Sequence, residues 1–302
     1  QSYISHPFSR FQRLDFGLTW HNISYDILDR VINTFTGQEE LLKRPGSIKF
    51  TTVLPTMSWV IDNSVFGITG PVDGYRQNAS VTASPGWKNN FSFQTMKFDA
   101  RKYWRVGRDY TFALRGFFGR SQGNKAQKFF LGGTPYLLTD FQSGETNGVK
   151  DPSIYRSVLT DTANSNIITD VYFTEYAFPM RGARFAERIG TNAALFNFEI
   201  RFPFINYLAL GFPLKLVLGN IRGHAFMDVG AAWDNYSEFS SNMWPDKYGP
   251  NNSGNFSPWV VTSGLGVKIN LGYFLLRLES AWDKNPSGYS KPQWYLSLGP
   301  DW

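Results

Sequence analysis

Two segments of the chain decide its fold: NAALFNFEIRFPF at residues 192–204 and GHAFMDVGAAW at residues 223–233. In the first segment apolar and polar side chains alternate, with Phe196, Phe198, Ile200 and Phe202 set between Asn197, Glu199 and Arg201. A period of two indicates a β-strand with one apolar face and one charged face. The second segment alternates in the same way, with Met227, Val229, Ala231 and Trp233 opposite His224, Asp228 and Gly230. We therefore expect two neighbouring strands whose polar faces carry Glu199 and Asp228.

A third segment, FPMRGAR at residues 178–184, closes the long polar stretch that precedes these strands. Its Arg181 is the nearest candidate cation in the sequence to the two acids. A cation placed between Glu199 and Asp228 would satisfy both carboxylates, because buried charges must be paired. We therefore expect a loop to carry Arg181 into the polar interior of a barrel and to dock it there. An ordinary salt bridge in the lumen, which only stabilises the barrel, is the alternative.

These residues together resemble the BamA/TamA-like (bacterial surface antigen) superfamily of outer-membrane β-barrels, which includes the two-partner secretion transporters. The resemblance rests on Arg181 with Gly182, on Glu199 ahead of an Arg-Phe-Pro, and on the spaced Phe226, Asp228 and Gly230. It implies that the loop after the Arg-Gly pair folds into the lumen, where Arg181 and Gly182 latch onto Glu199 and Asp228.

The resemblance covers residues 128–302, and one position departs from the family pattern. The family usually has an aromatic residue directly after Arg-Gly, whereas Ala183 stands there in this chain and Phe185 follows two places later. Gly132 and Gly133, in the sequence FLGG, resemble the segment that leads into the loop.

The composition favours a transmembrane barrel built from strands. The aromatic content of the 302 residues is 17%, the mean hydropathy is −0.29, and no stretch approaches the roughly 20 apolar residues that a spanning helix needs. Alternation between lipid-facing and lumen-facing residues explains many aromatic residues without long apolar runs. The sequence therefore predicts an all-β fold, a transmembrane antiparallel β-barrel, with a soluble β-sandwich as the alternative.

About ten strands are expected, with eight to twelve possible, because bacterial barrels have even strand numbers. We expect them at residues 11–21, 47–62, 75–84, 91–104, 110–120, 192–204, 223–233, 259–271, 273–282 and 293–302. Residues 24–45 are expected to form a polar loop. Residues 1–302 are predicted to form one barrel domain, with the long loop 121–191 folding over or into the lumen.

The connections between these strands alternate in length, which predicts the topology. Short turns of outer-membrane barrels lie in the periplasm and long loops lie outside. This rule places the C-terminus in the periplasm and the arginine-bearing loop on the outer side. The apolar stretch at residues 205–219 is expected at the membrane interface.

The end of the chain carries two further predictions. Trp302 is the last residue, with Leu296 and Leu298 on its face and Trp294 further back, which resembles the recognition signal of outer-membrane barrels. The alternative is a last strand that happens to end on tryptophan. We also expect residues 294–298 to pair with the first strand and residues 299–302 to fray, because Pro300 has no backbone donor.

The sequence gives little sign of catalysis, metal binding or nucleic-acid binding. The chain has no cysteine, which excludes disulfides and cysteine-ligated zinc, and its net charge of +6 is dispersed. Its three histidines, His6, His21 and His224, lie far apart, and no serine motif accompanies them. We therefore expect no enzyme activity, no cofactor, no metal and no nucleic-acid partner.

The expected function is that of a BamA-like barrel at the bacterial outer membrane, which assists the insertion, assembly or translocation of proteins. Its expected partners are outer-membrane lipids, client outer-membrane or secreted proteins, and other subunits of an outer-membrane complex. The alternative is a structural anchor for a periplasmic or surface partner complex, without transport. A diffusion pore is a third possibility, but about ten strands and a long loop leave little free lumen.

Overall fold

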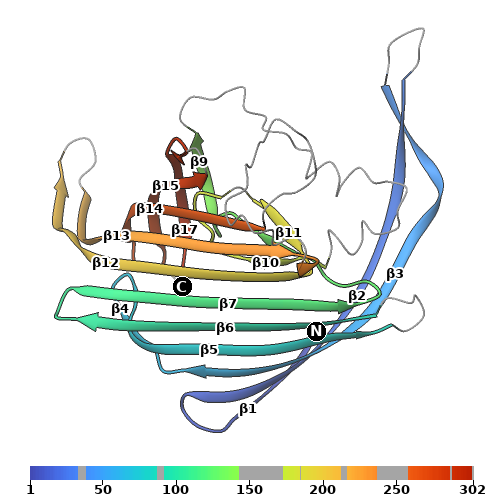
Figure 1. Ribbon diagram of the computed structural model, residues 1–302, viewed down its shortest axis with the longest axis horizontal. Helices are drawn as coiled ribbons and strands as arrows, with labels where there is room; N and C mark the ends of the chain where they lie inside the picture. Colours follow the sequence, from blue (N-terminus) through green and yellow to red (C-terminus); the bar gives the residue numbers. More distant parts are fainter. Residues whose placement is uncertain are drawn as a thin grey trace.

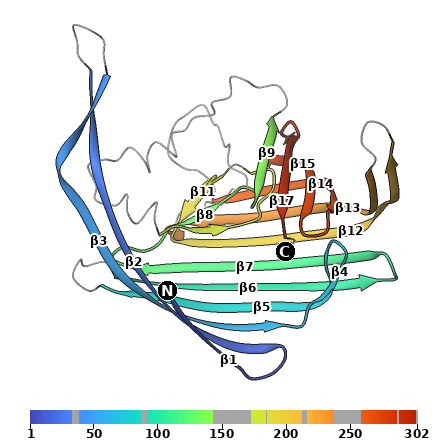
Figure 2. The ribbon, with the colours of Figure 1, turned by 180° about the vertical axis from the view of Figure 1, so that it is seen from behind.

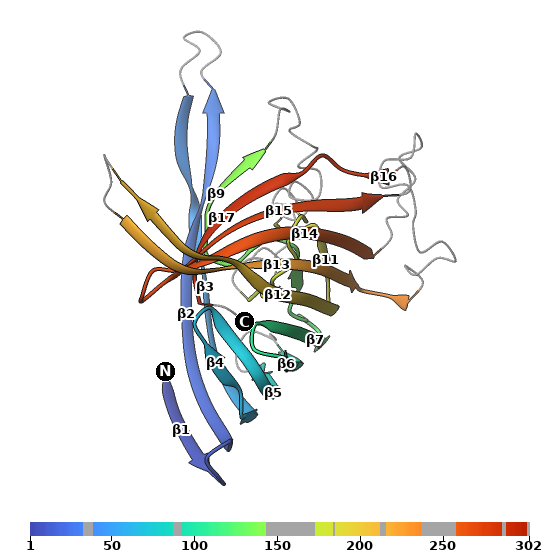
Figure 3. The ribbon, with the colours of Figure 1, turned by 90° about the vertical axis from the view of Figure 1, so that its left-hand side faces the viewer.

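The computed structural model of the protein describes residues 1–32, 39–86, 92–142, 173–183, 185–211, 216–236, 258–285 and 288–300. Most of these residues belong to one curved antiparallel sheet, which contains fourteen strands (Figures 1 and 3). A smaller sheet of three strands lies on its concave side (Figure 2). No helix among the described residues is both long and apolar enough to cross a membrane.

The large sheet has a simple order, in which most strands pair with their neighbours in the sequence. Along the sheet it contains β1 (Ser2–Pro7), β2 (Gln12–Ile32), β3 (Glu39–Asp62), β5 (Gly70–Pro85), β6 (Ser92–Val106), β7 (Tyr110–Gly123), β12 (Asn192–Leu210), β13 (Leu216–Trp233), β14 (Trp259–Asn270), β15 (Leu275–Asn285), β17 (Gln293–Gly299) and β9 (Leu137–Gln142). Two short strands lie off this path: β4 (Val65–Gly67) pairs with β5, and β16 (Gly288–Tyr289) pairs with β15. Each of the ten predicted strands corresponds to one strand of this wall, and the all-β antiparallel fold is confirmed.

The two faces of the wall differ as the alternation of side chains predicts. On the outer face Trp20 is 70% exposed and Leu265 is 54% exposed. On the concave face Lys268 and Glu279 are buried, although both carry charge. An apolar outer face and a polar inner face are typical of strands that separate lipid from a lumen.

One predicted loop is wrong. Residues 24–45 were expected to leave the sheet, but β2 and β3 remain paired from Tyr25 opposite Ile48 to Ile32 opposite Glu39. Two strands that pair with each other satisfy their own backbone groups, so they need no apolar face to continue. The apolar stretch at residues 205–219 also extends a pair of strands, since β12 and β13 stay paired to Leu210 opposite Leu216. Its place at the membrane interface stays a prediction.

The predicted pairing between the last and the first wall strand is also wrong. In the described residues β17 pairs with β15 and β9, and β2 pairs with β1 and β3. A short segment of the long loop therefore covers the edge that the first strand was expected to cover, because any strand can supply the backbone partners of an exposed edge. Gly299, expected to fray, pairs with Leu275. Trp302 lies outside the described residues.

The three-stranded sheet is formed by the described parts of the long loop. It comprises β10 (Glu175–Ala177), β8 (Phe129–Leu131) and β11 (Arg188–Gly190). Its apolar side chains pack against the concave face of the wall in one cluster: Phe117, Phe129, Leu131, Ala177, Met180, Ala183, Ala193, Leu195, Ala232 and Val260. The wall is recessed to receive them, since a Cβ on Gly119 would lie 2.4 Å from the Phe129 ring. The loop is therefore packed onto the inner surface at β7, β12, β13 and β14.

Candidate functional site

The backbone ahead of Arg181 is held from two sides. On the loop side, Gly133 and Met180 exchange two hydrogen bonds, of 3.2 and 3.0 Å between N and O. Gly132 and Gly133 both have positive φ, of 120° and 103°, a conformation that glycine adopts without steric cost. The predicted lead-in segment is therefore a turn that is bonded directly to the segment carrying the arginine.

On the wall side, two inward-pointing side chains bind the carbonyl groups of residues 178 and 179. Asn197 donates from Nδ2 to the carbonyl oxygen of Pro179 at 2.8 Å. Arg115 donates from Nη1 to the carbonyl oxygen of Phe178. These bonds fix the backbone just before Arg181 against β12 and β7.

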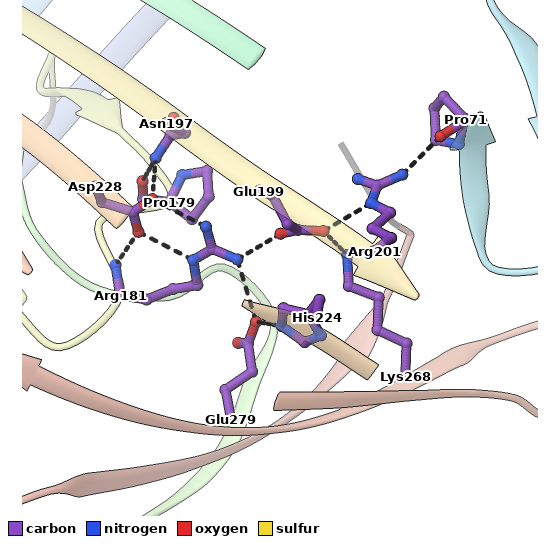
Figure 4. A network of polar contacts seen from close by, with 10 residues as sticks. All are labelled: Pro71, Pro179, Arg181, Asn197, Glu199, Arg201, His224, Asp228, Lys268 and Glu279. Carbon is purple, nitrogen blue, oxygen red and sulfur yellow. Dashed lines mark hydrogen bonds and ion pairs between the residues drawn. The ribbon is translucent and has the colours of Figure 1, made fainter. Parts of the chain in front are cut away.

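The structure places Arg181 among three acids of the wall (Figure 4). Its Nε and Nη2 donate to the two carboxylate oxygens of Asp228, each at 2.9 Å, and Nη1 donates to Glu199 at 2.7 Å and to Glu279 at 3.4 Å. The guanidinium carbon also lies 3.7 Å from the centroid of the Phe226 ring. Arg181 is only 2% exposed. Paired contacts to a carboxylate and an aromatic face make full use of the planar guanidinium group.

The acids that bind Arg181 are also held by other wall residues. Glu199 accepts hydrogen bonds on its second oxygen from Arg201 and from Lys268. The cluster thus contains three cationic side chains and three acidic ones. The cations are Arg181, Arg201 and Lys268, and the acids are Glu199, Asp228 and Glu279. This balance compensates the burial of so many charges, which would otherwise be strongly unfavourable.

His224 belongs to the same cluster, where it binds Glu279. It lies on β13 and binds Glu279 of β15, with 2.9 Å between Nε2 and Oε1. Gly266 of β14 lies between them, and a Cβ there would be 2.5 Å from the imidazole and 2.8 Å from the Glu279 side chain. His224 is fully buried, so its role in this arrangement is to support Glu279.

Glycine is required at the loop position next to Arg181. Gly182 has φ of +84°, and a Cβ there would lie 2.9 Å from the Cβ of Ala281 and 3.3 Å from that of Thr262. The loop can therefore approach β14 and β15 closely only because residue 182 has no side chain. We use the name latch for Arg181 and Gly182 together with Glu199 and Asp228.

The departure from the family pattern after Arg-Gly has a structural counterpart. Ala183 is 1% exposed and belongs to the cluster between loop and wall. Phe185 is 43% exposed and lies among the rings of Phe130, Tyr176 and Phe178, with centroids 5.8 to 6.3 Å away. The aromatic ring thus packs on the loop itself, while a small residue occupies the contact with the wall.

Trp294, Leu296 and Leu298 of the predicted C-terminal signal lie on the outer face of β17, whereas Trp302 lies outside the described residues. Trp294 is 41% exposed, and Leu296 and Leu298 are half-buried. They point away from the lumen, although Trp294 and Leu296 pair with Ser280 and Leu278, which flank Glu279 on β15. Their role as a recognition signal stays a prediction.

Sequence reasoning did not place several residues in this network, although their inward position was visible. They are Asn197, Arg201, His224, Phe226, Lys268 and Glu279. Alternation predicts that each faces the lumen, but it does not predict which strands lie opposite the loop.

Within the described ranges no group of three or more His, Cys, Asp or Glu residues could hold a metal ion. The arrangement is suited to holding a loop.

Comparison with known proteins agrees with this fold. The model of the Omp85 superfamily domain matches residues 1–302, whereas a search of curated proteins finds no match. Among solved structures, BamA from Haemophilus ducreyi lacking POTRA domains 1–3 is similar at a TM-score of 0.58 and 12% identity, over 98% of this chain and 53% of that chain. CdiB from Acinetobacter baumannii matches at a TM-score of 0.45 and 11% identity, over 98% of this chain and 40% of that chain. The chain therefore spans about half the length of the structures that it resembles. The chain belongs to the Omp85 superfamily of outer-membrane β-barrel proteins.

Proposed function

We propose that this chain is the membrane-embedded part of a protein that assists the insertion or translocation of other proteins at the bacterial outer membrane. The observation that carries the proposal is the buried latch, in which one loop arginine binds three acids of the wall. Membership of the Omp85 superfamily supports it, because members act on client outer-membrane or secreted proteins.

The latch would serve this function by keeping the loop in one position inside the wall. Five hydrogen bonds to carboxylates start from Arg181, counting its backbone N–H. Charge-assisted bonds of this kind are about twice as strong as neutral ones. A loop held so firmly keeps the lumen filled while the edge strands of the wall change partners.

The covering of the β17 edge supports a role in which strands are exchanged. β9 provides only a short partner, with a register shift between Leu296 and Ser297. An edge strand offers backbone donors and acceptors to any extended segment. We propose that a strand of a client protein can take the place of β9 on this edge.

The proposed orientation follows from the lengths of the connections. Residues 107–109 and 271–274 make short connections at the same end of the wall, and the chain leaves β17 at that end. We propose that this end faces the periplasm and that the arginine-bearing loop enters from the outer side. Reversed orientation would place long loops in the periplasm, against the usual arrangement of outer-membrane barrels.

A structural anchor without transport is the second candidate, and one observation favours it. The charges of the latch are balanced by internal partners, as expected for a rigid support. A diffusion pore is disfavoured, because the three-stranded sheet packs against the inner wall. We propose no catalytic role, and the buried His224–Glu279 pair is assigned to the support of the latch.

Reconstitution separates insertion from anchoring. The purified chain is placed in lipid vesicles, a urea-unfolded client barrel is added, and client folding is followed by heat-modifiable migration on a gel. We expect faster folding than in empty vesicles, and slower folding with Arg181→Lys, which keeps the charge but loses the paired geometry. Arg13→Lys is the matched control, because that side chain is 44% exposed. Equal client folding in empty and wild-type vesicles would contradict the insertion proposal and favour the anchor.

A further inference from the structure

The connection between β3 and β5 leaves the wall and folds back as a small hairpin. β4 pairs with the start of β5, with Val65 opposite Asp73 and Gly67 opposite Gly70. The hairpin lies at the end of the wall that carries the short turns (Figures 1 and 2). We name residues 63–74 the mouth hairpin.

The mouth hairpin reaches strands that are not its neighbours in the sheet. Arg201 of β12 donates from Nη1 to the carbonyl oxygen of Pro71 at 2.7 Å (Figure 4). Asn270 of β14 donates from Nδ2 to the carbonyl oxygen of Ile68. In the sheet, β6 and β7 separate β5 from β12, and β13 follows before β14. The hairpin therefore crosses the concave face and is fastened to its far side.

The two sides of the mouth hairpin have different surroundings. Thr69 is 8% exposed and Pro71 is also buried, so this side faces the lumen. Val65, Phe66 and Ile68 are 51%, 64% and 50% exposed. The hairpin is therefore buried on the side facing the lumen and exposed on the other side. It covers one end of the lumen.

The base of the mouth hairpin is held in place where the segment joins the wall. Asn63 and Tyr75 exchange two hydrogen bonds: Asn63 donates from its N–H to the Tyr75 carbonyl at 3.0 Å, and the Tyr75 N–H donates to Asn63 Oδ1 at 2.7 Å. Beside them Gly74 has φ of +90°, and a Cβ there would lie 2.4 Å from the Asn63 carbonyl oxygen. The backbone at the base is thus fixed, and only glycine fits at position 74. We call the hydrogen bonds from Arg201 and Asn270 at the other end the clasps. The clasps decide whether the hairpin stays over the lumen.

We propose that the mouth hairpin is a lid on the short-turn end of the lumen, held shut by Arg201 and Asn270 and able to open about its base at Asn63 and Gly74. Arg201 connects the lid to the latch, because its Nε binds one oxygen of Glu199 and Arg181 binds the other. Opening the lid breaks the hydrogen bond from Arg201 to the Pro71 carbonyl and so changes the surroundings of Glu199. The lid thus controls access to the latch from the end opposite the long loops.

Cysteine labelling tests the lid directly, because the chain has no native cysteine. Thr111 is 5% exposed and lies opposite Arg201 on β7, so Thr111→Cys reports on the space behind the lid. We expect a membrane-impermeant maleimide to label it slowly in lipid nanodiscs. Adding Asn270→Ala removes one neutral hydrogen bond, so labelling should become about threefold to tenfold faster. Adding Arg201→Lys, which cannot hold Glu199 and Pro71 in the same forked geometry, should accelerate labelling at least as much.

Two controls make each outcome decisive. Asn22→Ala, which removes a side-chain hydrogen bond to Thr51 away from the lid, should leave the labelling rate of Thr111→Cys unchanged. Phe66→Cys, on the open side of the lid, should react rapidly in every background. The proposal is overturned if Thr111→Cys reacts at the same rate with and without the clasps, whether that rate is fast or slow. Because labelling needs no client protein, this result is independent of the proposed insertion function.

Discussion

Arg181 donates three hydrogen bonds to the carboxylate of Asp228, one from its own backbone N–H and two from its guanidinium group. The backbone bond places the main chain of the loop at the wall, and the guanidinium bonds fix the side chain there. The bonds to Asp228 therefore depend both on the position of the loop backbone and on the identity of residue 181. Lysine at position 181 could keep only part of this arrangement, because its ammonium group is a point charge without a planar fork.

Replacing Arg181 by alanine should destabilise the fold more than any loss of a surface cation. Glu199, Asp228 and Glu279 would lose a buried partner, which typically costs about 3–5 kcal/mol, and water in the lumen would lower this figure. The unfolding free energy in urea, measured in detergent or lipid, tests the prediction. Arg13→Ala is the control, since the Arg13 side chain is 44% exposed although its partner Asp15 is buried, and an ion pair open to solvent contributes about 0–1 kcal/mol. Similar losses for the two variants would show that the latch does not stabilise the fold.

Gly182→Ala should destabilise the fold by two additive effects. A left-handed backbone costs a residue with a Cβ about 1–2 kcal/mol, and the contact with Ala281 at 2.9 Å adds overpacking of about 1–3 kcal/mol. Gly107 supplies a matched control, because its φ is +65° and nothing lies within 4 Å of an added Cβ. Gly107→Ala should therefore show only the backbone cost in the same unfolding measurement. If the two variants lose equal stability, the close approach of the loop to β15 is wrong.

The sequence predicts the wall well where lipid and lumen impose opposite demands on alternate residues. Phe196 and Glu199 follow this rule, and their faces could be assigned from alternation alone. The network around Arg181 was harder to predict, because some of its members come from distant strands. Lys268 lies 69 positions along the chain from Glu199, which it binds, and Glu279 lies 98 positions from Arg181. Which strands face each other across a lumen depends on curvature and on the path of the loop, and neither leaves a local pattern.

The errors in the wall have a similar origin. The hairpin of β2 and β3 continues past the alternating region, because paired backbones need no apolar face. The partner of β17 was predicted to be the first strand on the assumption that a barrel must close. The edge is instead covered by Leu137–Gln142, a segment of low regularity within a long polar stretch. Backbone pairing carries little side-chain information, so such a partner cannot be recognised from the sequence.

An arginine on the outer face of the wall should impair assembly in lipid. Phe196 is 44% exposed on β12, where it lies opposite Gly116 and Val229 in the middle of the wall. Phe196→Arg should cost about 2–4 kcal/mol if this position is near the bilayer midplane, and should lower the fraction of heat-modifiable protein in vesicles. Phe66→Arg is the matched control, because Phe66 is 64% exposed on the mouth hairpin and lies outside the wall. Equal yields of folded protein would refute the assignment of the outer face to lipid.

The last prediction concerns the base of the long loop, where Asp234 joins its two ends. The carboxylate accepts hydrogen bonds at 2.8 Å from the Lys128 ammonium group, just before β8, and from the Thr191 N–H, just before β12. Partial burial alone would raise the pKa of Asp234, but the bonds from Lys128 and Thr191 outweigh it and hold that pKa below its usual value. A carboxyl with a depressed pKa in the folded state stabilises the fold above the pKa of the unfolded chain, about 3.9 for aspartate. Its contribution must therefore be complete at neutral pH and disappear as the pH falls through the lower, folded pKa.

Asp234→Asn should consequently reduce the unfolding free energy at neutral pH, and its difference from the wild type should shrink progressively below about pH 5. Urea unfolding of the two proteins at a series of pH values from neutral to strongly acidic measures this difference. Lys128→Gln removes the main partner from the other side, so it should weaken the same pH dependence while leaving the carboxylate in place. A difference between wild type and Asp234→Asn that stays constant down to the lowest pH would mean that Asp234 acts through its shape and its acceptor atoms alone. A difference that shrinks in step with protonation, and is smaller in the Lys128→Gln background, would show that its charge holds the two ends of the loop together.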